Sequence, residues 1–349
     1  MTKKLLGKTP QELKEIALGL GLPAFTGKQV ADWIYKKKIR RIEDMTNLSR
    51  IAREKLAAEY EIGIDAYVDV QVSADGTKKY LFPCHTGTFI EAVMIPDKER
   101  ATLCVSSQAG CKMACAFCMT GRQGFKGNLE TAEIISQFIA ADERDSLTNA
   151  VFMGMGEPLD NLENVLKAIE VLTAEWGFAW SPKRITLSTI GVTGGNRDGL
   201  SPLKAYLDRT KCHLAVSLHN PFSAERLGIM PMEKAFPLEK TVELIRQYDF
   251  TGQRRVSFEY IMFDRLNDGK RHADGIIRLL KGLECRVNLI RFHAIPDSPL
   301  APSPLPVMEA FRERLNSAGI IATIRASRGE DIFAACGMLA GKGNKVSEP

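Results

Sequence analysis

The chain has 349 residues, of which 45% are hydrophobic and 26% are charged, and its formal net charge at pH 7 is +5. This is the length and composition of a globular protein with one large domain, or with a large domain and a small appendage, so disulfide staples are not needed to stabilise it. No apolar run is long enough for a membrane-spanning helix and no secretory leader is recognisable, so a cytoplasmic protein is expected. The mild positive charge permits an RNA partner without requiring one.

The first part of the chain predicts a small helical module. Residues 9–23 begin with a suitable N-cap at Thr9 and end in Gly and Pro, and residues 26–45 resemble a second helix. The second helix carries a basic run made of Lys36, Lys37, Lys38, Arg40 and Arg41. Such a run is either a solvated helix face or a patch that binds RNA phosphates, and the residues alone leave both readings open. Two strand-like pieces, residues 66–73 and 87–96, follow the module.

From Thr102 onward, β-rich runs alternate with amphipathic segments. The six runs are residues 102–107, 149–155, 184–190, 213–219, 254–263 and 285–292. This alternation predicts an α/β fold whose parallel strands and crossover helices curve into a barrel, and we expect a partial, TIM-like (β/α)6 barrel. Barrel enzymes carry their chemistry at the carboxyl ends of the strands, where this chain places polar and glycine-rich groups. Residues 342–349 are expected to form a disordered tail.

Four of the eight cysteines lie between residues 104 and 118. Cys111, Cys115 and Cys118 form the pattern C-x3-C-x2-C, and Cys104 lies upstream of it. Clustered thiols in a reducing compartment indicate metal binding or catalysis more than disulfides. Three cysteines can bind a cubane iron–sulfur cluster and leave one of its four irons without a protein ligand. Zinc is the alternative metal, but a closed zinc site needs a fourth ligand and the chain has no second C-x2-C.

The C-x3-C-x2-C pattern after the first barrel strand, with Phe117 before its last cysteine, resembles the radical S-adenosylmethionine superfamily. The resemblance implies one 4Fe-4S cluster whose open iron chelates S-adenosylmethionine, which a single electron cleaves to a 5′-deoxyadenosyl radical. It also implies a set of cofactor-binding residues on the later strand ends. These residues are Gly156, Glu157, Ser188, Ser217, Leu218 and His219. Each serine could otherwise be a strand-end cap.

A narrower resemblance rests on at least six motifs between Glu91 and Gly341. The motifs include TLCVSSQAGCKMACAFCMTGRQGF, VFMGMGEPL, LSTIGV, VSLHNP and RGEDIFAACGMLAG. Together they are similar to the RlmN family of dual-specificity RNA methyltransferases. The helical module matches the accessory RNA-binding domain of that family less specifically, which favours the RNA reading of the basic run.

The RlmN resemblance implies methylation of C2 of an adenosine in 23S rRNA and of an adenosine next to the anticodon in tRNA. That carbon is neither nucleophilic nor appreciably acidic, so a radical route is needed. Two molecules of S-adenosylmethionine serve each turnover, one to methylate the Cys336 thiolate and one to generate the radical that activates this methyl group. Cys104 then releases the product by forming a disulfide with Cys336. Glu91 is the implied proton acceptor, and the sequence leaves open whether Cys104 shares that role. Without the resemblance, Cys336 reads as a small buried apolar residue and Glu91 as a solvent-facing strand residue.

One position departs from the family pattern, because His293 stands where many members have an asparagine that contacts S-adenosylmethionine. The expected domains are an accessory RNA-binding domain over residues 1–90, a radical core over residues 91–341, and the tail. The expected partners are both RNAs and a flavodoxin-type electron donor, and a monomer is expected. The alternatives are a related enzyme that methylates C8 of adenosine and a zinc protein that binds RNA without catalysis.

Overall fold

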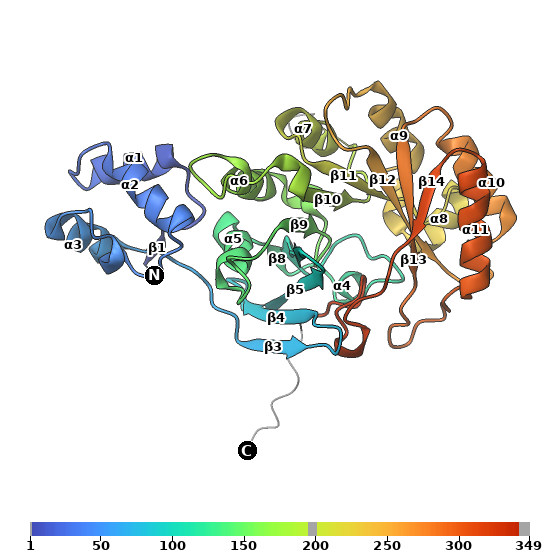
Figure 1. Ribbon diagram of the computed structural model, residues 1–349, viewed down its shortest axis with the longest axis horizontal. Coiled ribbons are helices and arrows are strands. Elements are labelled where there is room, and N and C mark those ends of the chain that lie inside the picture. Colours follow the sequence, from blue (N-terminus) through green and yellow to red (C-terminus); the bar gives the residue numbers. More distant parts are fainter. Residues whose placement is uncertain (1, 195–200, 342–349) are drawn as a thin grey trace, which may run out of the picture.

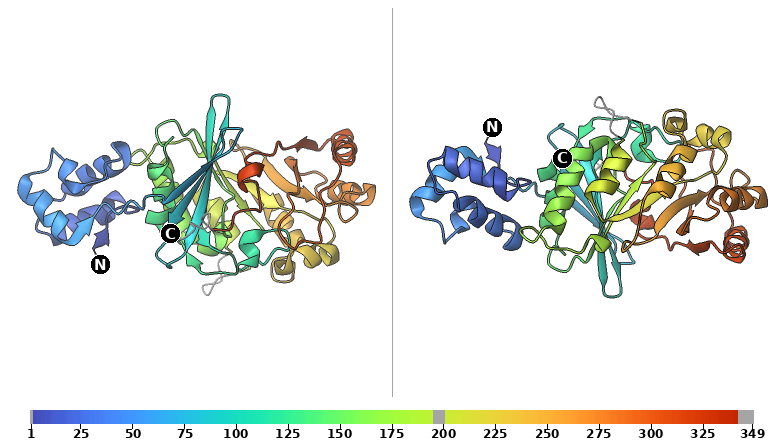
Figure 2. Two further views of the ribbon diagram at one scale, coloured as in Figure 1. Left: turned by 90° about the horizontal axis from the view of Figure 1, so that it is seen from below. Right: turned by 90° about the horizontal axis from the view of Figure 1, so that it is seen from above.

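The computed structural model describes residues 2–194 and 201–341, so the tail predicted over residues 342–349 lies outside the described residues. Figure 1 shows an elongated molecule in which an N-terminal helical module extends from one end of a larger α/β unit. The two views of Figure 2 show the same arrangement from below and from above. None of the described helices is both long and apolar enough to cross a membrane.

The N-terminal module contains three α-helices and a small parallel pair of strands. Its elements are β1 (Lys3–Lys4), α1 (Pro10–Gly19), α2 (Thr26–Ala31), the π-helix η1 (Asp32–Lys36), the 3-10 helix η2 (Ile42–Asp44), α3 (Arg50–Glu59) and β2 (Tyr60–Glu61). Helix α1 begins at the predicted N-cap, where the Thr9 hydroxyl accepts a hydrogen bond from the Glu12 amide and the Glu12 carboxylate accepts one from the Thr9 amide. The predicted second helix is interrupted, because Lys38 adopts a positive φ of 50° that ends the helical segment.

The larger unit contains a ten-stranded sheet within the described residues. Its strands are, in spatial order, β14 (Ile321–Ile324), β13 (Cys285–Arg291), β12 (Val256–Met262), β11 (His213–Ser217), β10 (Ile185–Thr189), β9 (Asn149–Phe152), β6 (Arg100–Cys104), β5 (Phe89–Asp97), β4 (Lys78–Pro83) and β3 (Asp69–Val72). Strands β6 and β9 to β14 are parallel, and β3, β4 and β5 extend the sheet in antiparallel fashion. The predicted parallel α/β sheet is therefore confirmed.

Two strands of this sheet were not predicted. Strand β14 lies at the edge of the sheet in the apolar, largely β-branched run of residues 320–324, so its strand signal is present in the sequence but lies beyond the six runs from which the barrel was predicted. Strand β4 begins with two lysines and contains a proline, which hide the strand signal. The predicted domain boundary at residue 90 falls inside β5, and the division itself stays a prediction.

Helices connect the parallel strands and pack on the sheet (Figure 1). The helices are α4 (Met119–Arg122), α5 (Thr131–Ala140), α6 (Leu162–Thr173), α7 (Pro202–Arg209), α8 (Ser223–Ile229), α9 (Leu238–Gln247), α10 (Lys270–Leu279) and α11 (Leu305–Ser317). Short 3-10 helices η3 (Pro158–Asn161), η4 (Pro182–Arg184), η5 (Pro231–Lys234) and η6 (Glu330–Ile332) lie in the loops, and β7 (Gln108–Ala109) pairs with β8 (Gly127–Asn128).

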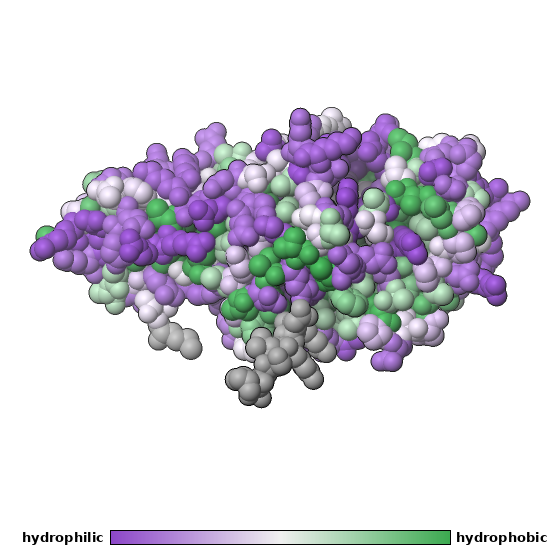
Figure 3. Space-filling model, turned by 60° about the horizontal axis from the view of Figure 1, so that its bottom comes forward, coloured by the Kyte–Doolittle hydropathy of each residue, from purple (hydrophilic) through white to green (hydrophobic). Residues whose placement is uncertain are grey.

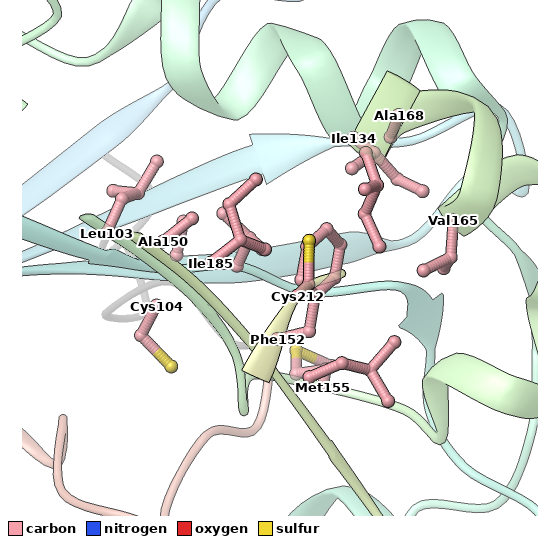
Figure 4. Packing of buried hydrophobic residues seen from close by; sticks show 14 of the residues in the cluster. Leu103, Cys104, Ile134, Ala150, Phe152, Met155, Val165, Ala168, Ile185 and Cys212 are labelled. Carbon is pink, nitrogen blue, oxygen red and sulfur yellow. The ribbon is translucent and has the colours of Figure 1, made fainter. Parts of the chain in front are cut away.

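Side chains on successive strand residues point to opposite faces of the sheet. One face packs against the helices and forms the hydrophobic core, and the other is the inner face of the curved sheet. Figure 4 shows Leu103 and Ile185 on the side that faces Ile134 of helix α5, whereas Cys104 points away from this cluster. Leu103, Ile134 and Ile185 have no solvent exposure. Burial of such apolar side chains stabilises the fold by about 1.5–3 kcal/mol each. The alternating residue, Cys104, is thereby directed to the inner face.

Candidate active site

The carboxyl ends of the parallel strands surround a cavity of about 260 Å³. Most residues predicted as functional line this cavity. They are Cys104, Cys111, Cys115, Cys118, Gly156, Glu157, Ser188, Ser217, His219, His293 and Cys336. Two predicted residues, Leu218 and Glu91, are not in its lining. The parallel registry of the sheet is the reason that residues so distant in sequence meet at one edge.

The loop that carries Cys111, Cys115 and Cys118 is tied to neighbouring segments by backbone hydrogen bonds. The amide of Ala116 donates to Ile229 O at 2.9 Å, and the amide of Met119 donates to Gly337 O at 2.8 Å. Burial raises the pKa of the Cys111 thiol to about 12 and raises that of Cys115 as well. Bound cations such as iron would favour the thiolates that this environment otherwise disfavours.

Three thiols on one wall of the cavity fit an iron–sulfur cluster, because each cysteine binds a different iron of a cubane. Within residues 2–194 and 201–341, no three His, Cys, Asp or Glu side chains converge as ligands of a single metal ion. The ligands of one zinc ion would lie roughly 3.8 Å apart, as zinc–sulfur bonds of about 2.3 Å in a tetrahedron require. The donor set and its position therefore fit the cluster that the sequence motif predicts.

Gly156 and Glu157 lie in the turn after strand β9. Gly156 has a φ of +98°, and a Cβ atom there would lie 2.5 Å from the Gln108 Cβ, so only glycine fits. The Glu157 carboxylate accepts hydrogen bonds of 3.0 Å from the amides of Leu159 and Ile190. Burial nevertheless raises the pKa of Glu157 to about 7. A bound ammonium group would stabilise the ionised carboxylate at this position.

The segment after strand β11 presents Ser217 and His219 to the cavity. Leu218 is fully buried, its amide donates to Glu259 O at 2.9 Å, and it does not line the cavity. The Nδ1 atom of His219 accepts a hydrogen bond of 3.0 Å from the Ile261 amide, which leaves the proton of the neutral ring on Nε2. Burial lowers the pKa of His219 to about 3, and Arg226 adds to this effect, so the imidazole is neutral at physiological pH.

Arg226 is a buried residue that sequence reasoning did not identify. Its Nε donates to Leu218 O at 2.9 Å, its Nη2 donates to Ser217 O at 2.8 Å, and its guanidinium forms an ion pair with Glu233. These bonds hold the turn after β11 in place beneath the cavity. An arginine within an amphipathic helix, such as α8, gives no local signal of this role.

Cys104 and Cys336 line the same cavity, and both are free thiols. Burial raises the pKa of the Cys104 thiol to about 12, and the nearby Cys336 thiol adds to the rise. Cys336 is exposed, and Cys104 is buried. Burial also raises the pKa of Cys336, and the Arg325 guanidinium opposes that rise.

Arg325 is a second residue that the sequence reasoning missed, because it follows the unpredicted strand β14. It lines the cavity, and its Nη1 lies 3.4 Å from the buried Glu259 carboxylate. The other Glu259 oxygen accepts a hydrogen bond of 2.8 Å from Asn288. Glu259 therefore orients a cation toward the two thiols, where it favours their thiolate forms.

The segment that carries Cys336 is anchored on both sides. On one side, the Asp331 carboxylate accepts hydrogen bonds from the Ser73 hydroxyl at 2.6 Å and from the Ala74 amide at 3.1 Å. On the other side, the Thr120 hydroxyl of α4 donates to Leu339 O at 2.8 Å. These contacts join the segment to the β3–β4 hairpin and to the cysteine loop.

Glu91 belongs to this anchoring system. Its carboxylate accepts hydrogen bonds from the amides of Ala340 at 2.7 Å and Gly341 at 3.1 Å, and it lies 3.3 Å from the Lys79 ammonium. The Glu91 and Lys79 side chains are 2% and 8% exposed. The proton-acceptor role predicted for Glu91 stays a prediction.

His293 is buried after strand β13 and faces the cavity. Its Nδ1 lies 3.3 Å from Glu330 Oε1 without the geometry of a hydrogen bond, and no other group of the described residues bonds to it. A buried nitrogen in this state has capacity for one polar contact with a ligand.

The basic run of the N-terminal module is partly engaged in contacts within the protein. Lys38 Nζ donates to Arg144 O and to Asp145, both at 2.9 Å, and thereby joins the module to the larger unit. Lys37 lies over the Trp33 ring, and Arg40 is exposed. Figure 3 shows mainly hydrophilic residues on the visible face of the module, while hydrophobic residues gather near the middle of the larger unit. The RNA-binding role of the run stays a prediction.

The chain is similar to known protein families and to proteins of known name. Residues 3–62 match the ribosomal RNA large subunit methyltransferase N-terminal domain, and residues 105–274 match the radical SAM superfamily. The chain is 58% identical to a probable dual-specificity RNA methyltransferase RlmN of Parabacteroides distasonis, over 97% of this chain and 96% of the relative. It is 40% identical to the dual-specificity RNA methyltransferase RlmN of Syntrophus aciditrophicus, over 95% and 94%. A radical SAM methyltransferase from Sphaerobacter thermophilus superposes with a TM-score of 0.88 and 34% identity, covering 97% of this chain and 100% of that one.

Proposed function

The chain belongs to the RlmN family of dual-specificity RNA methyltransferases, and we propose that it methylates C2 of adenosine in 23S rRNA and in tRNA next to the anticodon, with Cys336 as methyl carrier. The observation that carries this proposal is the meeting of Cys104 and Cys336 in the cavity that the three motif cysteines also line. A simple radical generator needs the three cysteines alone, whereas a methyl carrier that must release its product needs two further thiols.

The radical SAM family implies a 4Fe-4S cluster and S-adenosylmethionine. Cys111, Cys115 and Cys118 would hold the cluster, which with S-adenosylmethionine supplies a 5′-deoxyadenosyl radical when both are bound. Gly156 and Glu157 would receive the amino group of the methionine part, since Glu157 offers a carboxylate. Contacts to the rest of the molecule would come from Ser188, Ser217, the Leu218 backbone, His219 and His293.

The two thiols divide the transfer chemistry between them. The Cys336 thiolate accepts a methyl group from one S-adenosylmethionine, and a second molecule serves the radical step, so two are used per turnover. Addition of the radical carbon on Cys336 sulfur to C2 would join protein and RNA, and this adduct would then lose the C2 proton to a base and one electron to the electron-donor couple. The Cys104 thiolate would then attack the Cys336 sulfur and form a disulfide. The sulfur–carbon bond breaks, and its electron pair stays on carbon, which takes up a proton. Arg325 favours both thiolates from its place beside them.

Glu91 is proposed as the acceptor of the C2 proton. Its carboxylate would have to leave the amides of Ala340 and Gly341 to reach the RNA, because it is buried outside the cavity lining. Movement of the Cys336 segment would therefore accompany the proton transfer. The proposal further includes a flavodoxin-type electron donor, cytoplasmic residence and a monomeric enzyme.

The test is anaerobic turnover of reconstituted protein with 23S rRNA fragments and with tRNA, followed by mass spectrometry of the nucleosides. We expect 2-methyladenosine from both RNAs with wild-type protein and from neither with Cys336→Ala. A product methylated at C8 would establish the related C8 enzyme instead. The zinc alternative is set aside, because the chain belongs to a radical SAM family.

A further inference from the structure

Phe333 combines an exposed aromatic ring with an unfavourable backbone conformation. Its side chain is among the large apolar groups on the surface, with the residue 57% exposed. Its φ and ψ angles of 53° and 40° place it in the left-handed region, which a bulky residue with a Cβ atom rarely adopts. Single exposed apolar residues are common, but an exposed phenylalanine in a strained conformation next to a reactive segment indicates function.

The conformation of Phe333 is imposed by the structure around it. The Phe333 amide donates to Glu330 O at 3.1 Å, and the next amide, of Ala334, donates to Gly329 O at 2.8 Å. Asp331, within the same turn, is bound to Ser73 of the neighbouring hairpin. The phenylalanine is therefore presented to solvent by an anchored turn and not by a frayed end of the chain.

Phe333 stands close to the proposed methyl carrier but outside the cavity. Two residues separate it from Cys336, so their Cα atoms lie within about 11 Å of each other. Ala334, Ala335 and Cys336 line the cavity, whereas Phe333 does not. Its exposed ring is therefore available to a part of the RNA other than the base that enters the cavity.

Two cations lie on the same stretch of chain. Arg325 and Arg328 line the cavity, and the Arg328 side chain is 37% exposed and forms a long ion pair of 4.0 Å with Asp97. Proteins that bind single-stranded RNA combine cations along the phosphate backbone with aromatic rings on which bases stack. An enzyme that modifies a base inside a pocket must extrude it, and the neighbouring bases then lose a stacking partner.

We propose that Phe333 is a stacking platform for the nucleobase next to the reacting adenosine, and so forms an RNA subsite outside the cavity. This inference rests on the proposed RNA methyltransferase function. The aromatic face would replace the stacking that the flanking base loses when the adenosine is extruded. Phe333 is a positioning residue, since it touches neither S-adenosylmethionine nor the reacting atoms.

Four variants separate stacking from other roles. Phe333→Ala removes the ring, Phe333→Trp keeps an aromatic face, and Phe333→Gly removes the ring while relieving the left-handed strain. Leu305→Ala is the matched control, because Leu305 is also 57% exposed but lies on helix α11. Each variant is measured for RNA affinity, kcat, KM, self-methylation of Cys336 without RNA, and melting temperature.

Phe333→Ala and Phe333→Gly should weaken RNA binding and raise KM by about 5- to 150-fold, because that range corresponds to the stacking energy of one base on an aromatic ring. The effect on kcat should be smaller. Phe333→Trp and Leu305→Ala should stay within about threefold of wild type. Self-methylation of Cys336 should be unchanged in all four, and Phe333→Gly should melt no lower than wild type. RNA that carries 2-aminopurine on either side of the target adenosine should show a fluorescence change with wild type that Phe333→Ala lacks.

Unchanged RNA affinity in Phe333→Ala would overturn the subsite, as would a Trp variant as weak as the Ala variant. Loss of self-methylation in parallel with RNA binding would also overturn it, because a purely structural role affects both. If wild-type protein methylates neither RNA, the proposed function fails first; if wild type is active and Phe333→Ala equals it, only the stacking role fails.

Discussion

The Glu91 carboxylate accepts a hydrogen bond of 2.7 Å from the Ala340 amide, so the residue predicted as proton acceptor also holds the segment that carries Cys336. The buried Lys79 ammonium lies 3.3 Å from the same carboxylate, and we call this pair, together with its bond to the Cys336 segment, the clamp. Hydrogen bonds to charged groups are stronger than neutral ones, and breaking a buried pair leaves an uncompensated charge. The clamp therefore links the stability of the fold to the position of Cys336, the proposed methyl carrier.

Glu91→Ala is expected to lower the free energy of unfolding by about 3 kcal/mol, because it leaves Lys79 buried without its carboxylate partner. It should also slow self-methylation of Cys336, which a role in proton transfer alone would not affect. Urea unfolding and mass spectrometry of the protein check the two effects. Glu175→Ala, on an exposed surface, is the control. Normal stability and normal self-methylation would contradict the clamp.

Cys104→Ala is expected to accumulate a covalent protein–RNA adduct, because no second thiol attacks the Cys336 sulfur. Cys336→Ala should form neither adduct nor methylated protein, while its iron and sulfide content stays that of wild type. Denaturing gels after a single turnover and metal analysis measure these outcomes. Cys212→Ala, buried at the opposite end of strand β11, serves as a control for loss of a thiol. Free RNA alone with Cys104→Ala would contradict the resolving role.

The stability contribution of Glu157 depends on pH, because burial raises its pKa to about 7, above the usual value of 4.5. The folded state favours the protonated carboxyl, so the contribution is complete below about pH 4.5 and is lost as the pH rises through 7. The stability of Glu157→Gln relative to wild type should therefore be greater at pH 8 than at pH 5, by on the order of 2–3 kcal/mol without cofactor. Urea unfolding at both pH values measures this difference, in which any pH-independent cost of the amide cancels. An equal difference at both values would show that the carboxyl is not perturbed.

Gly156→Ala is expected to disrupt the turn after β9, since the new Cβ would lie 2.5 Å from the Gln108 Cβ. The Glu157 amide donates to Gln108 Oε1 at 2.9 Å, so the clash also displaces the carboxylate behind it. We expect a loss of roughly 2–4 kcal/mol in unfolding free energy and weaker binding of S-adenosylmethionine. Gly252→Ala is the control. Gly252 also has a positive φ, of +76°, but it has open space around it, so its substitution introduces backbone strain without a clash. Calorimetry of unfolding and of ligand binding compares the two variants; similar losses in both would rule out the clash.

The loop of Cys111, Cys115 and Cys118 and the strand ends could be predicted because their signals are local. The spacing of Cys111, Cys115 and Cys118 within one short loop already restricts them to one site. Alternation of β-rich runs with amphipathic segments predicted the parallel sheet, and parallel strands necessarily end at one edge. That rule alone brings Glu157, Ser188 and Ser217 together around the cavity.

Other parts of the site have no local signal. Arg325 follows strand β14 at the edge of the sheet, and Arg226 lies within the short helix α8. Their roles depend on partners far away in the chain, such as Glu259 and the carbonyl of Ser217. The family resemblance supplied the roles of Cys104, Cys336 and Glu91, because no pattern near these residues distinguishes them from core or surface positions.

The sequence by itself determined the chemistry that the chain can carry, through the types and local spacing of its cysteines and the order of its strands and helices. Only the tertiary structure decided which distant groups meet: Cys336 beside Cys104, Arg325 beside both, and Glu91 under Ala340. The physical reason is that local patterns report the backbone conformation of neighbouring residues. Contacts between distant segments depend on the curvature of the whole sheet and on the return of the last segment across its open edge.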